Sequence, residues 1–162
     1  MPRKRKTTSD VYRTFQRVFH ATDFSKASTQ AFTKAVRLAK QNHAELLLVH
    51  VLPRVLPAGY AVWGKTYRRI DAQERRFAQS KLSALLARAR RAKVRARTLL
   101  LSGVTYDQIV RAARSEGADL IVIGSHGRTG LSKLLLGSVA ERVSGLAPCP
   151  VLIVGSRKGR KR

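Results

Sequence analysis

The sequence predicts an α/β fold, a doubly wound sheet of five parallel strands in the order 3-2-1-4-5 with helices on both faces. Short apolar runs rich in Val, Ile and Leu alternate along the chain with longer segments of helical periodicity. The chain has 162 residues, 44% of them hydrophobic, which is enough for one domain with a substantial core. We expect this domain over residues 11–155, between disordered basic tails at residues 1–10 and 156–162.

Two strands and the helix between them are expected first. A strand over residues 13–21 leads into a helix over 26–41, for which Ser25 is a favourable N-cap. Small apolar residues in this helix recur at spacings of four, four and three, which places them on one buried stripe. The apolar run at 45–51 is a second buried strand, and the three elements form a βαβ unit of ordinary length.

A loop and a second pair of elements fill the middle of the chain. Residues 52–67 contain two prolines, two glycines and three aromatic residues, which predicts a loop. Its aromatic rings either cover a ligand or pack on the domain edge, and the second arrangement is the commoner one. Apolar spacings of four and three predict a helix over 71–92, followed by a strand over 94–101. Next comes a helix over 103–116 that Gly117 ends.

The fourth strand, at residues 119–123, runs into a glycine-rich segment. Gly124, Gly127 and Gly130 follow the strand at intervals of three. Glycines let a backbone approach a ligand closely and let it adopt positive φ, so a phosphate chain fits against such a segment. The alternative is an ordinary glycine-rich turn between a strand and a helix, and glycines alone do not distinguish the two.

A second group of small residues marks the start of the last helix. Gly137 and Ser138 precede helical residues 139–143, so backbone N–H groups are offered there to an anion. The hydroxyl of Ser138 is placed both to cap the helix and to donate to a phosphate oxygen. Residues 151–154 are the last strand and an edge of the sheet under the expected order.

The expected strand order brings distant residues to one crevice. In a doubly wound sheet, ligands bind at the carboxyl ends of the strands, where the strand order reverses. Asp23 follows the first strand and the glycine segment follows the fourth, so both border this crevice. Asp23 alone is equally well interpreted as a turn or capping carboxylate. Because topology brings the two signals together, they predict a ligand site.

The charge of the chain is unusual. Thirty-three Lys and Arg stand against nine Asp and Glu, for a formal net charge of +24. The two tails contribute +3 and +5, so +16 remains on the body. Such a field attracts polyanions, although a charge run is usually only a solvated face.

Several classes of protein are excluded or disfavoured. The single cysteine, Cys149, excludes an internal disulfide. No apolar run approaches the roughly 20 residues of a membrane span, and the basic start lacks the apolar segment of a signal peptide, so we expect a soluble cytoplasmic protein. His43 and His50 have no metal-ligand spacing with each other or with Cys149.

The spacing Gly124-x2-Gly127-x9-Gly137-Ser138 resembles the nucleotide-binding signature of the ATP-binding branch of the universal stress protein family. It differs from a P-loop. The similarity extends from about residue 13 to 155. This resemblance implies the adenine nucleotide alpha hydrolase-like fold, ATP as ligand with Mg²⁺ as a possible companion, and a homodimer through residues 151–154. The chain departs from the family pattern in having Ala21 where proline is usual and His20 where an apolar residue is usual.

The resemblance also implies roles for individual residues. Asp23 is expected at the adenosine end, and Val51 and Ile123 as walls of the adenine pocket. Independently of the resemblance, the charge of Arg128 beside the glycine segment makes it an additional phosphate partner. The complete expected site consists of Ala21, Thr22, Asp23, Val51, Ile123, Gly124, Ser125, His126, Gly127, Arg128, Gly130, Gly137, Ser138 and Val139.

Three functions remain open at this point. The favoured one is an ATP-binding regulatory or stress protein; the others are a slow ATP hydrolase on the same site and a nucleic-acid-binding protein on this fold. His126 lies in the glycine segment, but the sequence offers no carboxylate pair or second histidine to activate water. We therefore expect no efficient catalysis.

Overall fold

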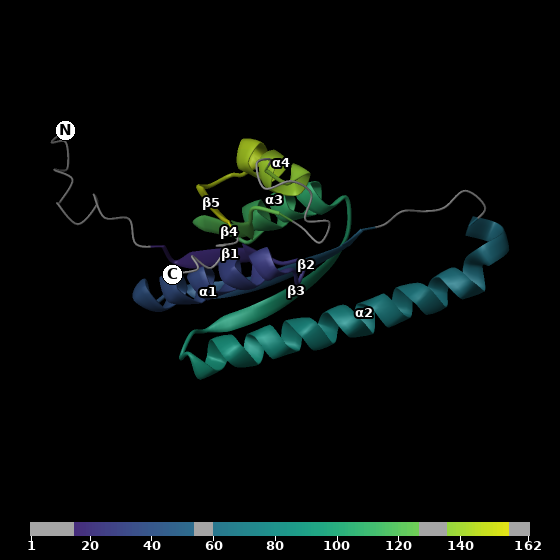
Figure 1. Ribbon diagram of the computed structural model, residues 1–162, viewed down its shortest axis with the longest axis horizontal. Helices are drawn as coiled ribbons and strands as arrows, with labels where there is room; N and C mark the ends of the chain where they lie inside the picture. The colour runs from purple at the N-terminus through teal and green to yellow at the C-terminus, as the bar shows by residue number, and fades with distance from the viewer. Residues whose placement is uncertain (1–14, 54–59, 127–135, 156–162) are drawn as a thin grey trace, which may run out of the picture.

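The computed structural model describes residues 15–53, 60–126 and 136–155, except for the side chains of 60–67. It contains one sheet of five parallel strands in the order β3-β2-β1-β4-β5, which confirms the predicted fold class (Figure 1). The strands are β1 (Arg17–Ala21), β2 (Glu45–Pro53), β3 (Ala96–Gly103), β4 (Leu120–Gly124) and β5 (Val151–Val154). The helices are α1 (Lys26–Gln41), α2 (Tyr60–Arg91), α3 (Thr105–Ser115) and α4 (Ser138–Leu146).

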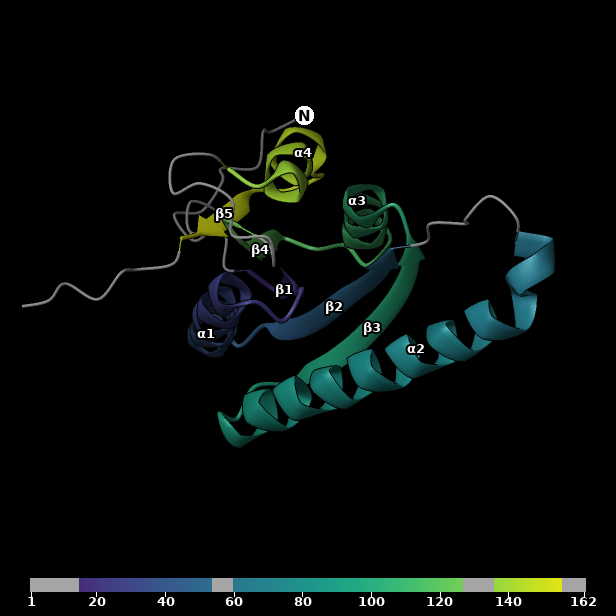
Figure 2. The ribbon, with the colours of Figure 1, turned by 45° about the vertical axis from the view of Figure 1, so that its right-hand side comes forward.

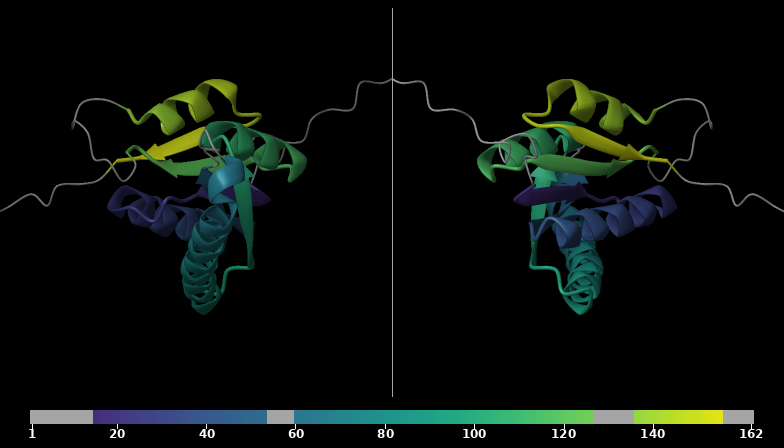
Figure 3. Two further views of the ribbon diagram at one scale, coloured as in Figure 1. Left: turned by 90° about the vertical axis from the view of Figure 1, so that its right-hand side faces the viewer. Right: turned by 90° about the vertical axis from the view of Figure 1, so that its left-hand side faces the viewer.

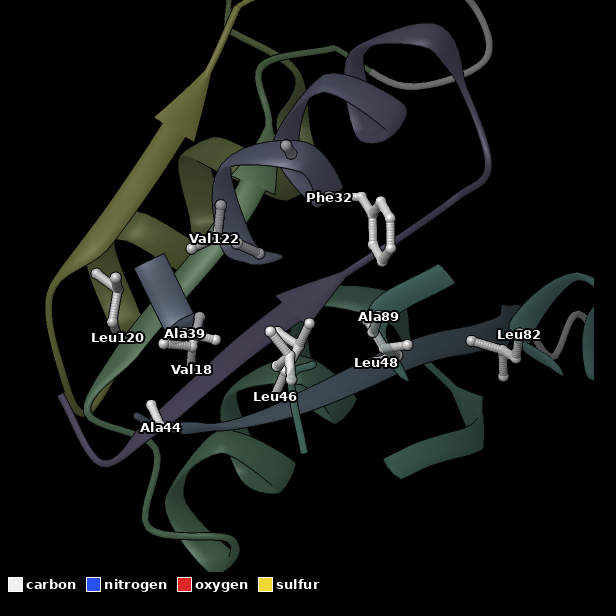
Figure 4. Close-up of a cluster of buried hydrophobic side chains, with 13 residues drawn as sticks. Val18, Phe32, Ala39, Ala44, Leu46, Leu48, Leu82, Ala89, Leu120 and Val122 are labelled. Atoms are coloured by element: carbon white, nitrogen blue, oxygen red, sulfur yellow. The ribbon is translucent and has the colours of Figure 1, made fainter. Parts of the chain in front are cut away.

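The helices cover both faces of the sheet, as Figures 2 and 3 show. Side chains alternate along each strand, so Val18 of β1 joins a core with α1 and α2, whereas Phe19 joins a second core with α3 and α4. Figure 4 shows the first of these cores, in which Phe32 of α1 and Leu82 of α2 point toward the strands. Strands buried on both faces explain why the sequence has continuous apolar runs rather than alternating ones.

Local signals placed two helix ends correctly. The side-chain oxygen of Ser25 accepts a hydrogen bond from the backbone N–H of Ser28 at 3.2 Å, and Ser25 is the N-cap of α1. Gly117 follows the last residues of α3 with a φ of +61°, a conformation that glycine adopts at little cost. No helix in the described parts of the chain is long and apolar enough to cross a bilayer.

Helix α2 differs most from the prediction. It begins at Tyr60, so the C-terminal half of the predicted 52–67 loop is helical. After Pro57 no proline interrupts the chain before Pro148, and a single glycine at position 64 costs a helix only about 1 kcal/mol. The result is a helix of 32 residues that packs along β2 and β3 and extends beyond the sheet (Figure 1).

The ends of β3 also differ from the prediction. Lys93 has a φ of +64°, and the N–H of Val94 bonds to the carbonyl of Ala89, so the end of α2 occupies residues assigned to the strand. The strand starts at Ala96 and continues to Gly103, which the sequence placed in a helix. Two predicted regions, the tails and part of the glycine segment, lie outside the described residues.

His20 lies in the centre of the sheet and is fully buried. Its Nδ1 is 3.0 Å from the carbonyl oxygen of Val122, and its Nε2 has no partner among the described residues. Burial lowers the pKa of His20 to about 4, although the Val122 carbonyl and Asp23 oppose the shift. The imidazole is therefore neutral in the folded protein at neutral pH.

This burial makes stability depend on pH. The unfolded chain takes up a proton on His20 below a pKa of 6.5, whereas the folded chain does so only near 4. We predict that the free energy of unfolding is insensitive to this group above pH 6.5 and falls by roughly 3 kcal/mol between pH 6.5 and 4. Denaturant unfolding of the parent and of His20→Leu at several pH values measures the difference. If the free energy of unfolding changes with pH by the same amount in both proteins, His20 is excluded as the cause.

Candidate functional site

A cavity of about 720 Å³ opens at the carboxyl ends of β1, β2 and β4. Its wall is formed by the turn after β1, the end of β2, the residues after β4, the start of α4 and one side of α2. This is the crevice that the strand order predicts, because β1 pairs with both β2 and β4 at the point where the order reverses. Asp23 and the Gly137–Ser138 segment, far apart in the sequence, both line it.

The turn after β1 is held in a fixed shape by its own polar groups. The N–H of Phe24 donates to Thr22 Oγ1 at 3.0 Å, and the N–H of Ser25 donates to Asp23 Oδ1 at 3.0 Å. The Ser28 hydroxyl also donates to Thr22 Oγ1, at 2.6 Å. Asp23 thus stabilises the turn, as its interpretation as a turn carboxylate predicts, and it also lines the cavity.

Phe24 adopts a left-handed conformation in this turn. Its φ is +64°, which costs a residue with a large side chain on the order of 1 kcal/mol or more. Its ring packs on the buried ring of His50 with a centroid distance of 4.5 Å, and His50 Nδ1 lies 2.7 Å from the carbonyl oxygen of Thr22. Packing and hydrogen bonding from β2 therefore hold the strained turn at the edge of the cavity.

Gly124 is required for packing rather than for a curled backbone. A Cβ at this position would lie 3.0 Å from the carbonyl carbon of Ala27 and 3.0 Å from the backbone nitrogen of Ser28, at the start of α1. Its φ is not among the positive ones. Gly124 therefore has a structural role, because it lets β4 and α1 approach each other at the edge of the cavity.

Helix α4 presents its N-terminus to the cavity. Its N-cap is Gly137, which has no side-chain capping bond, and Ser138 is the first helical residue. The predicted cap by Ser138 is wrong, because the helix starts one residue earlier than the sequence suggested. Gly137 itself is positioned by its N–H, which donates to the carbonyl of Ser125 at 2.8 Å. The first-turn N–H groups are left to other acceptors.

Ser125 and His126 follow β4 and form a hydrogen-bonded pair. Ser125 Oγ lies 2.8 Å from His126 Nδ1, and His126 Nε2 is buried without a partner among the described residues. If Nδ1 accepts the serine proton, Nε2 carries a hydrogen and is a donor. Both residues line the cavity, and the hydrogen bond between the Ser125 carbonyl and the Gly137 N–H places Ser125 beside the start of α4.

One wall of the site comes from α2, which was not predicted. Ile70, Gln73, Glu74, Phe77 and Ala78 line the cavity from this helix. Ile70 is 50% exposed and Phe77 53% exposed, values that are high for large apolar side chains. Their spacing of seven residues was the available signal, but the predicted start of the helix at residue 71 excluded Ile70 from the pattern.

Eleven of the fourteen predicted site residues line this one cavity. They are Ala21, Thr22, Asp23, Val51, Ile123, Gly124, Ser125, His126, Gly137, Ser138 and Val139. The other three, Gly127, Arg128 and Gly130, lie outside the described residues, as do the side chains of the aromatic residues at 60–67. The structure therefore brings together every predicted residue that it describes.

The charges in the cavity are unevenly distributed. Two carboxylates, Asp23 and Glu74, line it, whereas none of the described lining residues is Lys or Arg. This contrasts with a chain that has 33 basic and nine acidic residues. Glu74 comes from α2, which packs on β2 and β3, whereas Ser138 and the N-terminus of α4 come from the side of β5. Asp23 follows β1, which lies between these two sides.

Groups for metal binding or covalent catalysis are few. The described residues contain no group of three or more His, Cys, Asp and Glu side chains close enough to hold a metal ion. Cys149 is half-buried next to β5, and burial raises the pKa of its thiol, which disfavours the reactive thiolate.

Comparison with known proteins agrees with this geometry. The model of the universal stress protein family matches residues 14–155. The chain belongs to this family. Among its universal stress protein relatives, MJ0531 of Methanocaldococcus jannaschii is 35% identical over 144 residues, which cover 89% of this chain and 84% of the relative.

Solved structures of universal stress proteins share the fold. MJ0577, also from Methanocaldococcus jannaschii, superimposes with a TM-score of 0.80 at 25% identity and covers 90% of this chain and 99% of its own. A universal stress protein solved in complex with cAMP has a TM-score of 0.64 at 25% identity, and the match covers 87% of this chain and 97% of that one. An adenine nucleotide is thus a ligand within the family.

The packing role of Gly124 can be tested by a substitution that adds a single methyl group. We predict that Gly124→Ala lowers the free energy of unfolding by about 1–3 kcal/mol, because the added Cβ overpacks the contact between β4 and α1. Gly145→Ala in α4 is the matched control, since a Cβ there meets nothing within 4 Å. The control should change stability by no more than about 1 kcal/mol, in the stabilising direction. Equal effects in denaturant titrations would contradict the packing role.

Proposed function

We propose that this universal stress protein binds an adenine nucleotide, with ATP the preferred form, and acts through binding rather than turnover. The observation that carries the proposal is the division of one cavity into two chemically different ends. One end combines the carboxylates of Asp23 and Glu74 with apolar walls; the other offers hydroxyl groups and the N-terminus of α4. A nucleotide has the same polarity, with an amine-bearing base at one end and an anion at the other.

The phosphates belong at the α4 end. The first-turn N–H groups of α4 and the positive end of its dipole favour an anion, and Ser138 adds a hydroxyl. His126 Nε2, buried and unpaired among the described residues, gains an acceptor when a phosphate oxygen lies beside it. Arg128 would add a positive charge from the neighbouring segment. When Mg²⁺ accompanies ATP it is held mainly by the phosphate oxygens and water.

The base and the ribose belong at the opposite end. Asp23 accepts hydrogen bonds from the ribose hydroxyls, while Val51 and Ile123 provide the apolar walls that small-ligand sites use for a ring. Helix α2 adds Phe77, whose exposed ring loses water contact when a base lies against it. Glu74, as an acceptor, favours the amino group of adenine over the oxygen that guanine carries at the same position.

A slow hydrolase on the same site is the second candidate. The Ser125–His126 pair, with its 2.8 Å contact, is the one feature that favours it, because a paired histidine is a potential base. An efficient histidine base needs a carboxylate that orients its ring. Among the described residues, no carboxylate forms a hydrogen bond with His126. We therefore assign the site to nucleotide binding that changes the surface of the protein, in a regulatory or stress-response role.

Removal of the Asp23 carboxylate should weaken binding selectively. We predict that Asp23→Ala reduces ATP affinity by roughly 10- to 150-fold, the equivalent of about 1.5–3 kcal/mol for one charge-assisted hydrogen bond. Its affinity for bare triphosphate should hardly change, because the phosphate end is intact. Isothermal titration calorimetry with both ligands measures the two affinities.

Asp107→Ala is the matched control for this experiment, because it removes an aspartate that pairs with Arg111 on α3, outside the cavity. It should bind ATP as the parent does. Circular dichroism confirms that each variant is folded. If Asp23→Ala and the control bind ATP with equal affinity, the adenosine end has been assigned to the wrong residues.

We also propose that two copies pair through β5. This strand lies at the edge of the sheet, is apolar throughout and leaves Leu152 37% exposed. An edge strand offers unpaired backbone groups to a partner strand. Lys34 and Arg37 of α1 line a groove beside the strand, so a second copy brings like charges close together. Dimerisation should therefore strengthen as salt concentration rises.

A single charge in the edge strand should separate the two copies. We predict that the parent is a dimer at micromolar concentration and moderate salt, and that Leu152→Arg is a monomer, since it places a buried charge in the interface. Leu146→Arg changes a leucine of α4 that is 54% exposed and is the control. Light scattering gives the masses. A monomeric parent, or a dimer that survives Leu152→Arg, would rule out pairing through β5.

A further inference from the structure

The basic residues of the helices gather on one side of the sheet. Helices α1 and α2, which cover one face, contain thirteen Lys and Arg, four in α1 and nine in α2, against two Asp and Glu. Helices α3 and α4, on the opposite face, contain three basic and two acidic residues. The net charges are +11 and +1. A general adaptation of the surface for solubility has no reason to favour one side.

We call the outer surface of α1 and α2 the α1–α2 face. Little of its charge is neutralised locally. Helix α1 has no acidic residue, and on α2 Asp71 pairs with Arg75 at 2.9 Å. Arg69, Arg76 and Arg90 are exposed. They are separated by seven and fourteen residues, so they lie on one side of the helix, with a rise of about 10 Å for each seven residues.

The two helices form one surface. The guanidinium of Arg88, on α2, lies over the ring of Phe32, on α1, 4.7 Å from its centroid. Phe32 is itself part of the core beneath both helices (Figure 4). Helix α2 is about 48 Å long at 1.5 Å per residue, and Figure 1 shows it extending past the sheet. The charge is thus presented on a long, rigid support.

We propose that the α1–α2 face binds the phosphate backbone of nucleic acids, without reading base sequence. A row of cations along a rigid helix matches a polymer with regularly spaced phosphates. Seven of the nine basic residues of α2 are arginines, whose planar guanidinium groups donate two parallel hydrogen bonds to a phosphate. Solubility by itself is better served by acidic residues than by basic ones.

The same face is poorly suited to a lipid surface. A helix that lies on a membrane buries large apolar side chains in the lipid. On α2 the described large apolar side chains that are exposed are Ile70 and Phe77, and both line the cavity. The outer side carries Ser, Ala, Gln and Arg instead, as at Ser83 and Ala87. Phosphates on a polymer, rather than phosphates on a bilayer, fit this composition.

The test compares two variants with equal loss of charge, both in the complete chain with its tails. One changes Arg69, Arg76 and Arg90 to Gln on the α1–α2 face; the other changes Arg111, Arg114 and Arg142 to Gln on the opposite face. Fluorescence anisotropy measures binding to labelled duplex DNA and to single-stranded RNA over a range of salt concentrations. Vesicles of phosphatidylcholine with phosphatidylserine as the anionic lipid serve as a third ligand at the same ionic strengths.

We expect the parent to bind DNA with an affinity that falls steeply as salt rises. The α1–α2 variant should lose affinity on the order of 100-fold at about 0.1 M salt, and the slope of log K against log salt should decrease by about 2 to 3 for duplex DNA. For single-stranded RNA the decrease should be about 2. The variant of the opposite face should bind nearly as the parent does. Comparison of the two nucleic acids shows which of them is preferred.

Three results would overturn the proposal. The first is an equal loss of affinity in both variants. The second is unchanged binding in the α1–α2 variant, which would assign the affinity to the tails. The third is tighter binding of the parent to anionic vesicles than to either nucleic acid. Neither set of arginines lines the nucleotide cavity, so each folded variant should bind ATP as the parent does. Circular dichroism and ATP titration therefore check that each variant is folded. Nucleotide binding and nucleic-acid binding can therefore fail independently.

Discussion

The parallel pairing of β1 with β4 is the contact on which the rest of the structure depends. His20 and Ala21 of β1 lie beside Val122 and Ile123 of β4, so the turns after the two strands open at the same edge of the sheet. Gly124 lets β4 end against the start of α1, where any side chain would meet the helix backbone. Strand order and one missing side chain together create the crevice and determine which residues face it.

Charge is separated in this molecule at two scales. Within the cavity, Glu74 on α2 lies toward the β2–β3 side and the N-terminus of α4 lies toward the β4–β5 side, and under the proposed function this asymmetry orients the nucleotide. Among the helices, the excess of basic residues lies on α1 and α2, whereas none of the described residues that line the cavity is Lys or Arg. The two proposed ligands, a small nucleotide and a polyanion, are thus assigned to different places on one chain.

Sequence patterns predicted the features that depend on local chemistry or on topology. Strand order follows from the alternation of elements, and the caps at Ser25 and Gly117 follow from residue type. The start of α2 was missed because aromatic and glycine residues around position 64 resemble a loop when no apolar stripe is visible. Consequently the contribution of α2 to the cavity, including Glu74 and Phe77, was not predicted. The packing role of Gly124 depends on the distance between two elements, which no pattern along the chain contains.

A crystal structure of the protein with ATP would test the central claim, the polarity of the cavity, most directly. The account predicts phosphate oxygens within hydrogen-bond distance of the first N–H groups of α4 and of Ser138, with the base between Asp23, Val51 and the Glu74–Phe77 side of α2. Phosphates beside Asp23 and Glu74, or an empty cavity at saturating ATP, would contradict it.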